Sequence, residues 1–214
     1  MELKPFNKRD HYNRKSVAEQ LSEAYINVFY KLSAGAYGEE LPSHQTDCVY
    51  QPAHAVAVLQ ALQWVAEDGY QHRSYKRLKM IDLGCGMGNN LFLANEIRVD
   101  GESAIEPSGI ELELRFVRMA QILGFPINYG DMLSVPLNKY DIIYFFNSLG
   151  HGDKMRKQYE NFSSQIRRGR YLVLASSDSP DKRYFDKVYE IDKYLTIRIY
   201  KRNNRPYKPL TKGK

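Results

Sequence analysis

The spacing of hydrophobic and polar positions changes along the chain, and the change predicts where helices and strands lie. In "SVAEQLSEAYINVFYKL" (16–32), apolar residues recur at helical spacing and predict an amphipathic helix. A second helix is predicted over "PAHAVAVLQALQWVAEDG" (52–69), with Pro52 in its first turn and Gly69 just past its end. The N-terminal third of the chain is therefore expected to be helical.

Beyond residue 77, short apolar runs alternate with amphipathic segments. Such alternation, with strands apolar on both faces, predicts a parallel sheet covered by helices on both sides. The two last segments alternate inward and outward instead, which is typical of a two-stranded antiparallel ribbon. The predicted strands are 77–84, 108–113, 126–133, 140–148, 169–177, 184–191 and 194–202, and the predicted helices are 89–98, 114–124 and 153–168.

Length and composition fit one domain with a sizeable core, since the chain has 214 residues of which 43% are hydrophobic. No apolar run approaches the ~20 residues that a membrane span needs, and the N-terminus lacks the apolar core of a signal peptide. We therefore expect a soluble, cytoplasmic protein without a membrane partner. Cys48 and Cys85 are the two cysteines, and their contexts do not favour a structural disulfide.

The formal net charge of +6 is concentrated at the C-terminus. From Arg198 to Lys214 there are seven basic residues and no acidic one. Such a tail is a candidate site for RNA or an acidic partner. The alternative is a solvated, partly disordered tail rich in Pro, Asn and Lys.

The stretch "KMIDLGCGMGNN" (79–90) places three glycines directly behind an apolar run. Glycines at this density indicate a backbone that turns tightly and approaches a ligand closely. In open α/β sheets, ligands bind beyond the carboxyl ends of strands. A dinucleotide fingerprint would have glycine at the position of Asn89, and the Gly-Lys-Ser/Thr ending of a P-loop is absent.

"DLGCGMG" closely resembles the first motif of class I S-adenosylmethionine-dependent methyltransferases. "GIELELRFVRMAQILGF", "YGDML" and "YDIIYFFNS" resemble the second, third and fourth motifs in order, and the closing strand pair fits the family's reversed last hairpin. The resemblance implies a Rossmann-like, doubly wound, mostly parallel seven-stranded sheet with an antiparallel C-terminal strand and helices on both faces. It divides a single domain into an N-terminal helical extension or lid (1–77), a core (78–200) and a basic tail (201–214).

The same resemblance implies S-adenosyl-L-methionine as cofactor, S-adenosyl-L-homocysteine as product, and no metal. The glycines would pass close to the methionine portion, and Asp82 would face its ammonium group. Glu111 would accept hydrogen bonds from both ribose hydroxyls; Glu106 is the alternative ribose acid, and choosing Glu111 makes "VDGESAIEPS" (99–108) an extended loop. Asp131 would take the adenine amino group. The full set of implied cofactor-binding residues is Asp82, Gly84, Cys85, Gly86, Gly88, Glu111, Leu112, Asp131, Met132 and Asn147.

The methyl acceptor is less defined by the sequence. Asn147 would face the substrate, and His151 is the candidate general base, the alternative being a solvated loop histidine. The motifs of DNA amino- and cytosine-C5-methyltransferases are absent, so a small-molecule or undefined acceptor ranks first. A protein-lysine acceptor, as in the Dot1-like enzymes, or an RNA acceptor docked by the basic tail ranks second. A non-catalytic cofactor- or RNA-binding module remains open, and Asn89 disfavours a nicotinamide oxidoreductase.

Overall fold

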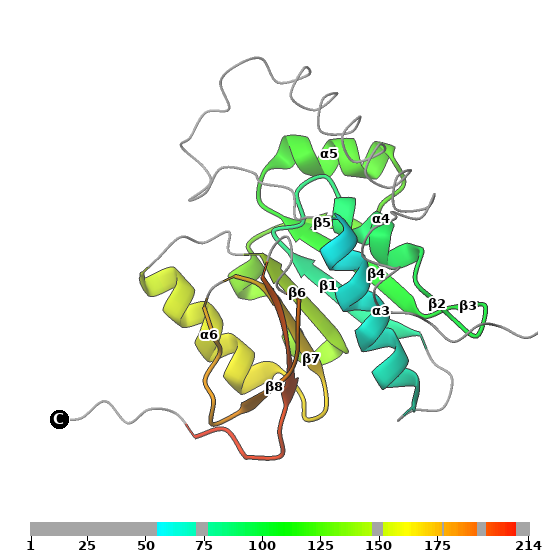
Figure 1. Cartoon of the computed structure of the whole chain (residues 1–214). Helices are drawn as coiled ribbons and strands as arrows, with labels where there is room; N and C mark the ends of the chain where they lie inside the picture. The colour runs from blue at the N-terminus through cyan, green and yellow to red at the C-terminus, as the bar shows by residue number, and fades with distance from the viewer. Residues whose placement is uncertain (1–54, 72–76, 147–151, 177, 192–195, 209–214) are drawn as a thin grey trace, which may run out of the picture. The chain divides into compact units, whose positions relative to one another are not determined.

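The computed structural model describes residues 55–71, 77–146, 152–176, 178–191 and 196–208 (Figure 1). All of them belong to one compact unit, Pro42–Lys214. The helix predicted over 16–32, and also Cys48, Asn147 and His151, lie outside the described residues.

Seven strands form one sheet in the order β5-β4-β1-β6-β7-β9-β8. The neighbours from β5 to β7 pair in parallel, whereas β9 is antiparallel to both β7 and β8. The mostly parallel seven-stranded sheet with an antiparallel C-terminal strand is thus confirmed. The strands are β1 (Leu78–Leu83), β4 (Ile105–Glu111), β5 (Ile127–Tyr129), β6 (Ile142–Phe146), β7 (Tyr171–Ala175), β8 (Phe185–Ile191) and β9 (Ile197–Arg202).

Helices lie on both sides of this sheet, as the apolar strands require (Figure 1). Helix α6 and two 3-10 turns cover one face, and the remaining helices pack on the other side of the strands. The helices are α3 (Ala55–Gln71), α4 (Asn89–Asn95), α5 (Leu114–Ile122) and α6 (Asp153–Gln165), and the 3-10 turns are η1 (Met132–Ser134) and η2 (Leu137–Lys139).

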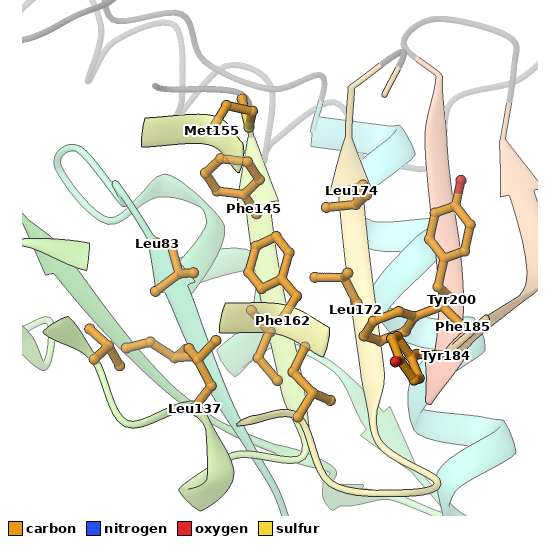
Figure 2. Close-up of a cluster of buried hydrophobic side chains, with 14 of the residues drawn as sticks. Leu83, Leu137, Phe145, Met155, Phe162, Leu172, Leu174, Tyr184, Phe185 and Tyr200 are labelled. Carbon is orange, nitrogen blue, oxygen red and sulfur yellow. The ribbon is translucent and has the colours of Figure 1, made fainter. Parts of the chain in front are cut away.

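The largest buried cluster lies between α6 and the sheet (Figure 2). Alternate residues of adjacent strands point into it, among them Leu83 and Phe145, and both are fully buried. Phe162 of α6 meets Phe145 edge to face, with ring centroids 5.5 Å apart. This packing fixes the strands whose carboxyl ends form the site described below.

The segment before β4 differs from the expected extended loop. A short hairpin, β2 (Arg98–Val99) with β3 (Glu102–Ser103), is followed at once by β4, which begins at Ile105. The prediction was wrong because it started the strand at Ser108, three residues after its observed beginning. Proline is unusual within a central strand, but Pro107 is tolerated here. Its nitrogen, like that of Gly109, faces β5, but β5 pairs only from Gly109 onward, so no donor is needed at Pro107.

The structure also differs from the prediction at the end of helix α3 and at the start of the basic tail. Helix α3 continues past Gly69 to Gln71, because the helix packs closely on β1 there: a Cβ on Gly69 would lie 2.8 Å from Leu78 Cδ1. The basic tail begins after residue 202 and not at 201, since β9 contains Arg198, Lys201 and Arg202. Lys201 forms an ion pair with Asp68 of α3 at 2.7 Å.

Candidate functional site

The turn between β1 and α4 is held in a conformation that glycine suits. Gly84, Gly86 and Gly88 have φ angles of 76°, 55° and 89°, a region that side-chain-bearing residues rarely adopt. The backbone N–H groups of Gly84 and Cys85 donate to the carbonyl of Ile110 at 2.9 and 3.1 Å. The turn is therefore tied to the carboxyl end of β4.

The third glycine has a packing role of its own. Gly88 N-caps α4, and a Cβ added there would lie 2.9 Å from the Phe125 ring and 3.2 Å from Ile127 Cδ1. The space beside Gly88 is thus filled by the protein interior. The need for glycine at position 88 is therefore explained by packing alone, without any ligand.

The Cys85 side chain also faces the interior. It is 5% exposed, and its sulfur lies where a Cβ on Gly109 would come within 2.5 Å. Burial raises the pKa of the Cys85 thiol well above its ordinary value, and the nearby Asp82 and Glu111 carboxylates raise it further. Only the backbone of Cys85 can therefore face a ligand.

Glu111 joins the glycine turn to the end of β4. It is 8% exposed, and its Oε2 accepts from the Gly86 N–H at 2.8 Å. Its Oε1 accepts from the N–H groups of Leu112 and Glu113, both at 2.8 Å. Glu106, the alternative acid, is exposed near the start of the same strand and far from the turn.

Asp82 lies one residue before the end of the neighbouring strand β1, as the register partner of Gly109, and is almost fully buried, with 1% of its surface exposed. Burial raises the pKa of the Asp82 carboxyl from 3.8 to about 7, the Asn90 hydrogen bond lowers it, and Glu111 raises it. Asn90 Nδ2 donates to Asp82 Oδ2 at 3.0 Å. The site thus contains a carboxyl that titrates near neutrality.

Tyr144 completes this buried group from β6, where it is the register partner of Asp82. Its side chain is fully buried, and its hydroxyl has no hydrogen-bond partner within the described part of the chain. Burial, and then the Asp82 charge, raise the pKa of Tyr144 well above its ordinary value. Neither Tyr144 nor Asn90 was predicted from the sequence; the signal for Tyr144 was a hydroxyl within an otherwise apolar strand.

Asp131 follows β5 at the same edge of the sheet. It is exposed and caps η1, its Oδ1 accepting from the Leu133 N–H at 2.9 Å. Met132 beside it is half-buried, and Leu112, at the end of β4, is 43% exposed. Polar acceptors and apolar side chains therefore meet at the carboxyl ends of β4 and β5.

The fold brings the predicted residues that it describes to one edge of the sheet, at the carboxyl ends of β1, β4 and β5. Asn147 directly follows β6 in sequence but, like His151, lies outside the described residues. No group of three or more His, Cys, Asp or Glu able to hold a metal ion occurs among the described residues. In that same part of the chain, no helix is long and apolar enough to span a membrane. Chemically, the edge offers hydrogen-bond acceptors and a titratable carboxyl to a polar, cationic ligand.

No protein-family model and no curated protein matches this sequence. Solved structures match the fold. An RNA methyltransferase from Salinibacter ruber, solved with S-adenosyl-L-homocysteine, is 17% identical with a TM-score of 0.53, over 77% of this chain and 100% of that one.

Magnesium protoporphyrin IX methyltransferase from Synechocystis also matches. Its structure with bound S-adenosyl-L-homocysteine is 16% identical with a TM-score of 0.52, over 86% of this chain and 98% of that one. Its structure with S-adenosylmethionine is 17% identical with a TM-score of 0.50, over 88% and 97%. At these identities the likeness establishes the fold, so the resemblance to class I methyltransferases is confirmed at that level.

Proposed function

We propose that this chain is an S-adenosylmethionine-dependent methyltransferase. The observation that carries the proposal is the pair of buried carboxylates, Asp82 and Glu111, at the ends of adjacent strands on either side of the glycine turn. Structures of the same fold contain S-adenosylmethionine or S-adenosyl-L-homocysteine, which supports the choice of cofactor.

The residues present fit this cofactor. A carboxylate offers about four acceptor positions, and three N–H groups occupy Glu111, so a ribose hydroxyl has a place to donate. Asp131 Oδ2 accepts no hydrogen bond within the described part of the chain and suits an amino group of adenine. Leu112 and Met132 provide apolar surface for the ring edge.

The Asp82 carboxylate would stabilise the positive charge of the methionine portion electrostatically. A cation nearby favours the charged carboxylate and lowers its pKa, so binding would release the proton that burial retains on Asp82 near pH 7. Asn90 already donates to the carboxylate and holds it in orientation. We expect proton release on binding at neutral pH.

When bound, S-adenosylmethionine supplies an electrophilic methyl group on a sulfonium. The task of the chain is then to position the acceptor in line and to exclude water, which can provide much of the acceleration. We propose that Asn147, following β6, faces the acceptor. His151 would accept a proton where the acceptor must lose one.

We propose a small molecule as the acceptor. The absence of the DNA-methyltransferase motifs supports this choice, and one protein of the same fold is named for a porphyrin substrate. Another is named an RNA methyltransferase, which keeps RNA as the alternative acceptor. A protein lysine, or cofactor binding without transfer, are the remaining candidates.

Calorimetric titration with S-adenosylmethionine, S-adenosyl-L-homocysteine and NAD tests the site. We expect the two sulfur compounds to bind and NAD not to bind. Glu111→Gln should weaken binding by about 10- to 100-fold, the loss expected for a charged hydrogen bond, while Glu106→Gln on the same strand serves as the matched control. Thermal unfolding of both variants checks the fold. Equal affinities of the two variants would refute the assignment of Glu111.

Transfer itself is tested with methyl-labelled cofactor and a panel of acceptors. His151→Ala should lower the rate while cofactor affinity stays unchanged, whereas Asn147→Ala should lower the rate and also weaken cofactor binding. If tight cofactor binding comes with no labelled product from any acceptor class, the non-catalytic binding module replaces the enzyme.

A further inference from the structure

The positive charge of this protein is gathered at the end of the sheet opposite the glycine turn. Three segments meet there: the turn from α6 into β7 (166–171), the entrance to β8 (181–186), and the chain from the end of β9 (202–208). Together they carry eight basic and two acidic residues. Their net charge, eight minus two, is +6, which equals the formal net charge of the whole chain. The remaining residues therefore carry equal numbers of basic and acidic side chains. We call these three segments the cationic end.

Hydrogen bonds join the three segments into one surface. Gly169 N–H donates to the Arg202 carbonyl at 2.8 Å, and Asn203 N–H donates to the Tyr184 carbonyl at 2.9 Å. The Tyr184 hydroxyl then donates to the Lys208 carbonyl at 2.9 Å. The chain beyond β9 is therefore fixed against the entrance to β8 as far as residue 208.

Arg202 connects these segments from the protein interior. Its side chain is buried, and its guanidinium donates to the carbonyls of Tyr184 and Ser163 at 3.1 and 3.2 Å. The group also lies over the Tyr184 ring, 4.8 Å from its centroid. Burial lowers the pKa of Arg202, and the nearby Arg168 charge lowers it further. Arg202 is thus used inside the protein, and the half-buried Arg170 pairs with Asp141. The remaining cations of the three segments lie on the surface.

The outer cations are not neutralised by neighbours. Arg167, Arg168, Lys182, Arg205 and Lys208 are exposed, and none of them forms an ion pair with the described part of the chain. Arg183, by contrast, is bound to Asp181 through both carboxylate oxygens. Like charges held this close repel one another, so a polyanion that screens them would be bound favourably.

A depression of about 190 Å³ opens beside these cations, between α6 and the chain beyond β9. Arg156, Arg183 and Lys208 line it, together with the rings of Tyr159 and Tyr207. It is smaller than the ~300–1,000 Å³ of a complete small-molecule site. Its size and its rings suit one group of a longer ligand, such as a base stacked on Tyr207.

An acidic residue in the same depression helps to decide which class of polyanion the surface would bind. Glu160 lines it, is exposed, and forms no ion pair with the residues that the structure describes. A carboxylate repels phosphate but accepts a hydrogen bond from a ribose 2′-hydroxyl, which RNA has and DNA lacks. An acidic protein segment would offer neither stacking bases nor this donor.

We propose that the cationic end, with the depression beside it, binds single-stranded RNA. The parallel strands β1 and β7 begin at this end, whereas the glycine turn follows the carboxyl end of β1. RNA bound here is therefore held away from the cofactor site, and the surface is a docking site rather than the place of transfer. The proposal does not rest on methyl transfer, because RNA binding can be measured without cofactor.

The test is fluorescence anisotropy of the full chain with a labelled oligouridylate of about 15 nucleotides, within the ~4–16 that one binding site covers. The triple variant Arg168→Gln/Lys182→Gln/Arg205→Gln removes three cations of the surface. Each phosphate contact on a single strand contributes about 0.7 to the salt slope, so the slope should fall by about 2. Affinity near 0.1 M salt should fall by about 100-fold by the same relation.

The matched control removes the same charge elsewhere, at Arg98 of β2, Arg118 of α5 and Lys154 at the start of α6, all exposed and outside the three segments. Its affinity should stay within a few-fold of wild type. Equal losses in both triple variants, or no loss in the first, would overturn the proposal. Thermal unfolding should show all variants folded, since every substituted side chain is exposed.

Two further arms separate RNA from other polyanions. Tyr207→Leu should weaken RNA binding by about 5- to 100-fold, the range for one stacked base, without changing the salt slope. Oligothymidylate of equal length should bind more weakly than oligouridylate, and Glu160→Ala, which removes the acceptor oxygens, should remove that preference. Equal affinity for DNA, or poly-glutamate binding that competes as strongly as RNA, would contradict an RNA site.

Discussion

The Asp82→Asn substitution should separate the charge of Asp82 from its shape. The amide keeps an oxygen that can accept from Asn90 Nδ2, so the local hydrogen bond is preserved. What it removes is the ionisation of a carboxyl that is 1% exposed and whose pKa burial raises to about 7. In the unfolded chain the same group has a pKa of 3.8.

The sign and size of the effect follow from these two pKa values. Between them the folded protein retains a proton that the unfolded chain has lost, so the free energy of unfolding falls as the pH rises. A difference of about 3 pKa units, at 1.36 kcal/mol for each, amounts to about 4 kcal/mol. The stability associated with the raised pKa of Asp82 is therefore complete below about pH 4 and lost by about pH 8.

Urea unfolding of wild type and Asp82→Asn across this range measures the effect. The variant should gain about 4 kcal/mol over wild type between about pH 4 and pH 8. Glu106→Gln, which removes an exposed carboxyl from the same sheet, is the control and should not reproduce this gain. Parallel stability curves for wild type and Asp82→Asn would refute the raised pKa of Asp82 and the proton release proposed for cofactor binding.

Two other pairs of substitutions test the packing around the site by urea unfolding. Gly88→Ala should lower the free energy of unfolding by more than Gly124→Ala does. Both glycines have φ above 80°, which costs a residue with a side chain about 1–2 kcal/mol, but only a Cβ at position 88 meets the Phe125 ring. Similar losses in the two variants would show that the ring moves aside. Tyr144→Phe should stabilise by about 1 kcal/mol because it removes a buried hydroxyl without a partner in the described part of the chain, whereas Tyr171→Phe should destabilise by a similar amount because it loses a bond to Asp68. Destabilisation by Tyr144→Phe would indicate that its hydroxyl is satisfied.

The strands of the core could be predicted from the sequence because they are apolar runs with turn residues between them. The start of β4 could not, because Pro107 is acceptable there only through the late start of β5, a fact of register and not of composition. The C-terminal basic residues were assigned to a tail for a similar reason. Nothing local shows that Arg202 finds carbonyl acceptors on α6 and at the entrance to β8.

The candidate site was likewise predictable from the sequence only in part. Glycines and acidic residues after apolar runs predicted the positions of Asp82, Glu111 and Asp131 at strand ends. Sequence spacing could not show that Gly88 faces Phe125, that the Cys85 sulfur faces Gly109, or that Tyr144 lies beside Asp82. These contacts join residues from separate elements, and only the folded sheet brings them together.

The position of β9 has a consequence for the synthesis of this protein. Strand β9, the last of the described strands in sequence, lies inside the sheet between β7 and β8, and β8 pairs with it alone among the described strands. Until β9 has left the ribosome, β8 lacks its partner and β7 has an open edge. Domains fold as units during synthesis, so this sheet cannot close before β9 emerges. A chain truncated before β9 would expose two unpaired strand edges to the chaperones and proteases of the cell.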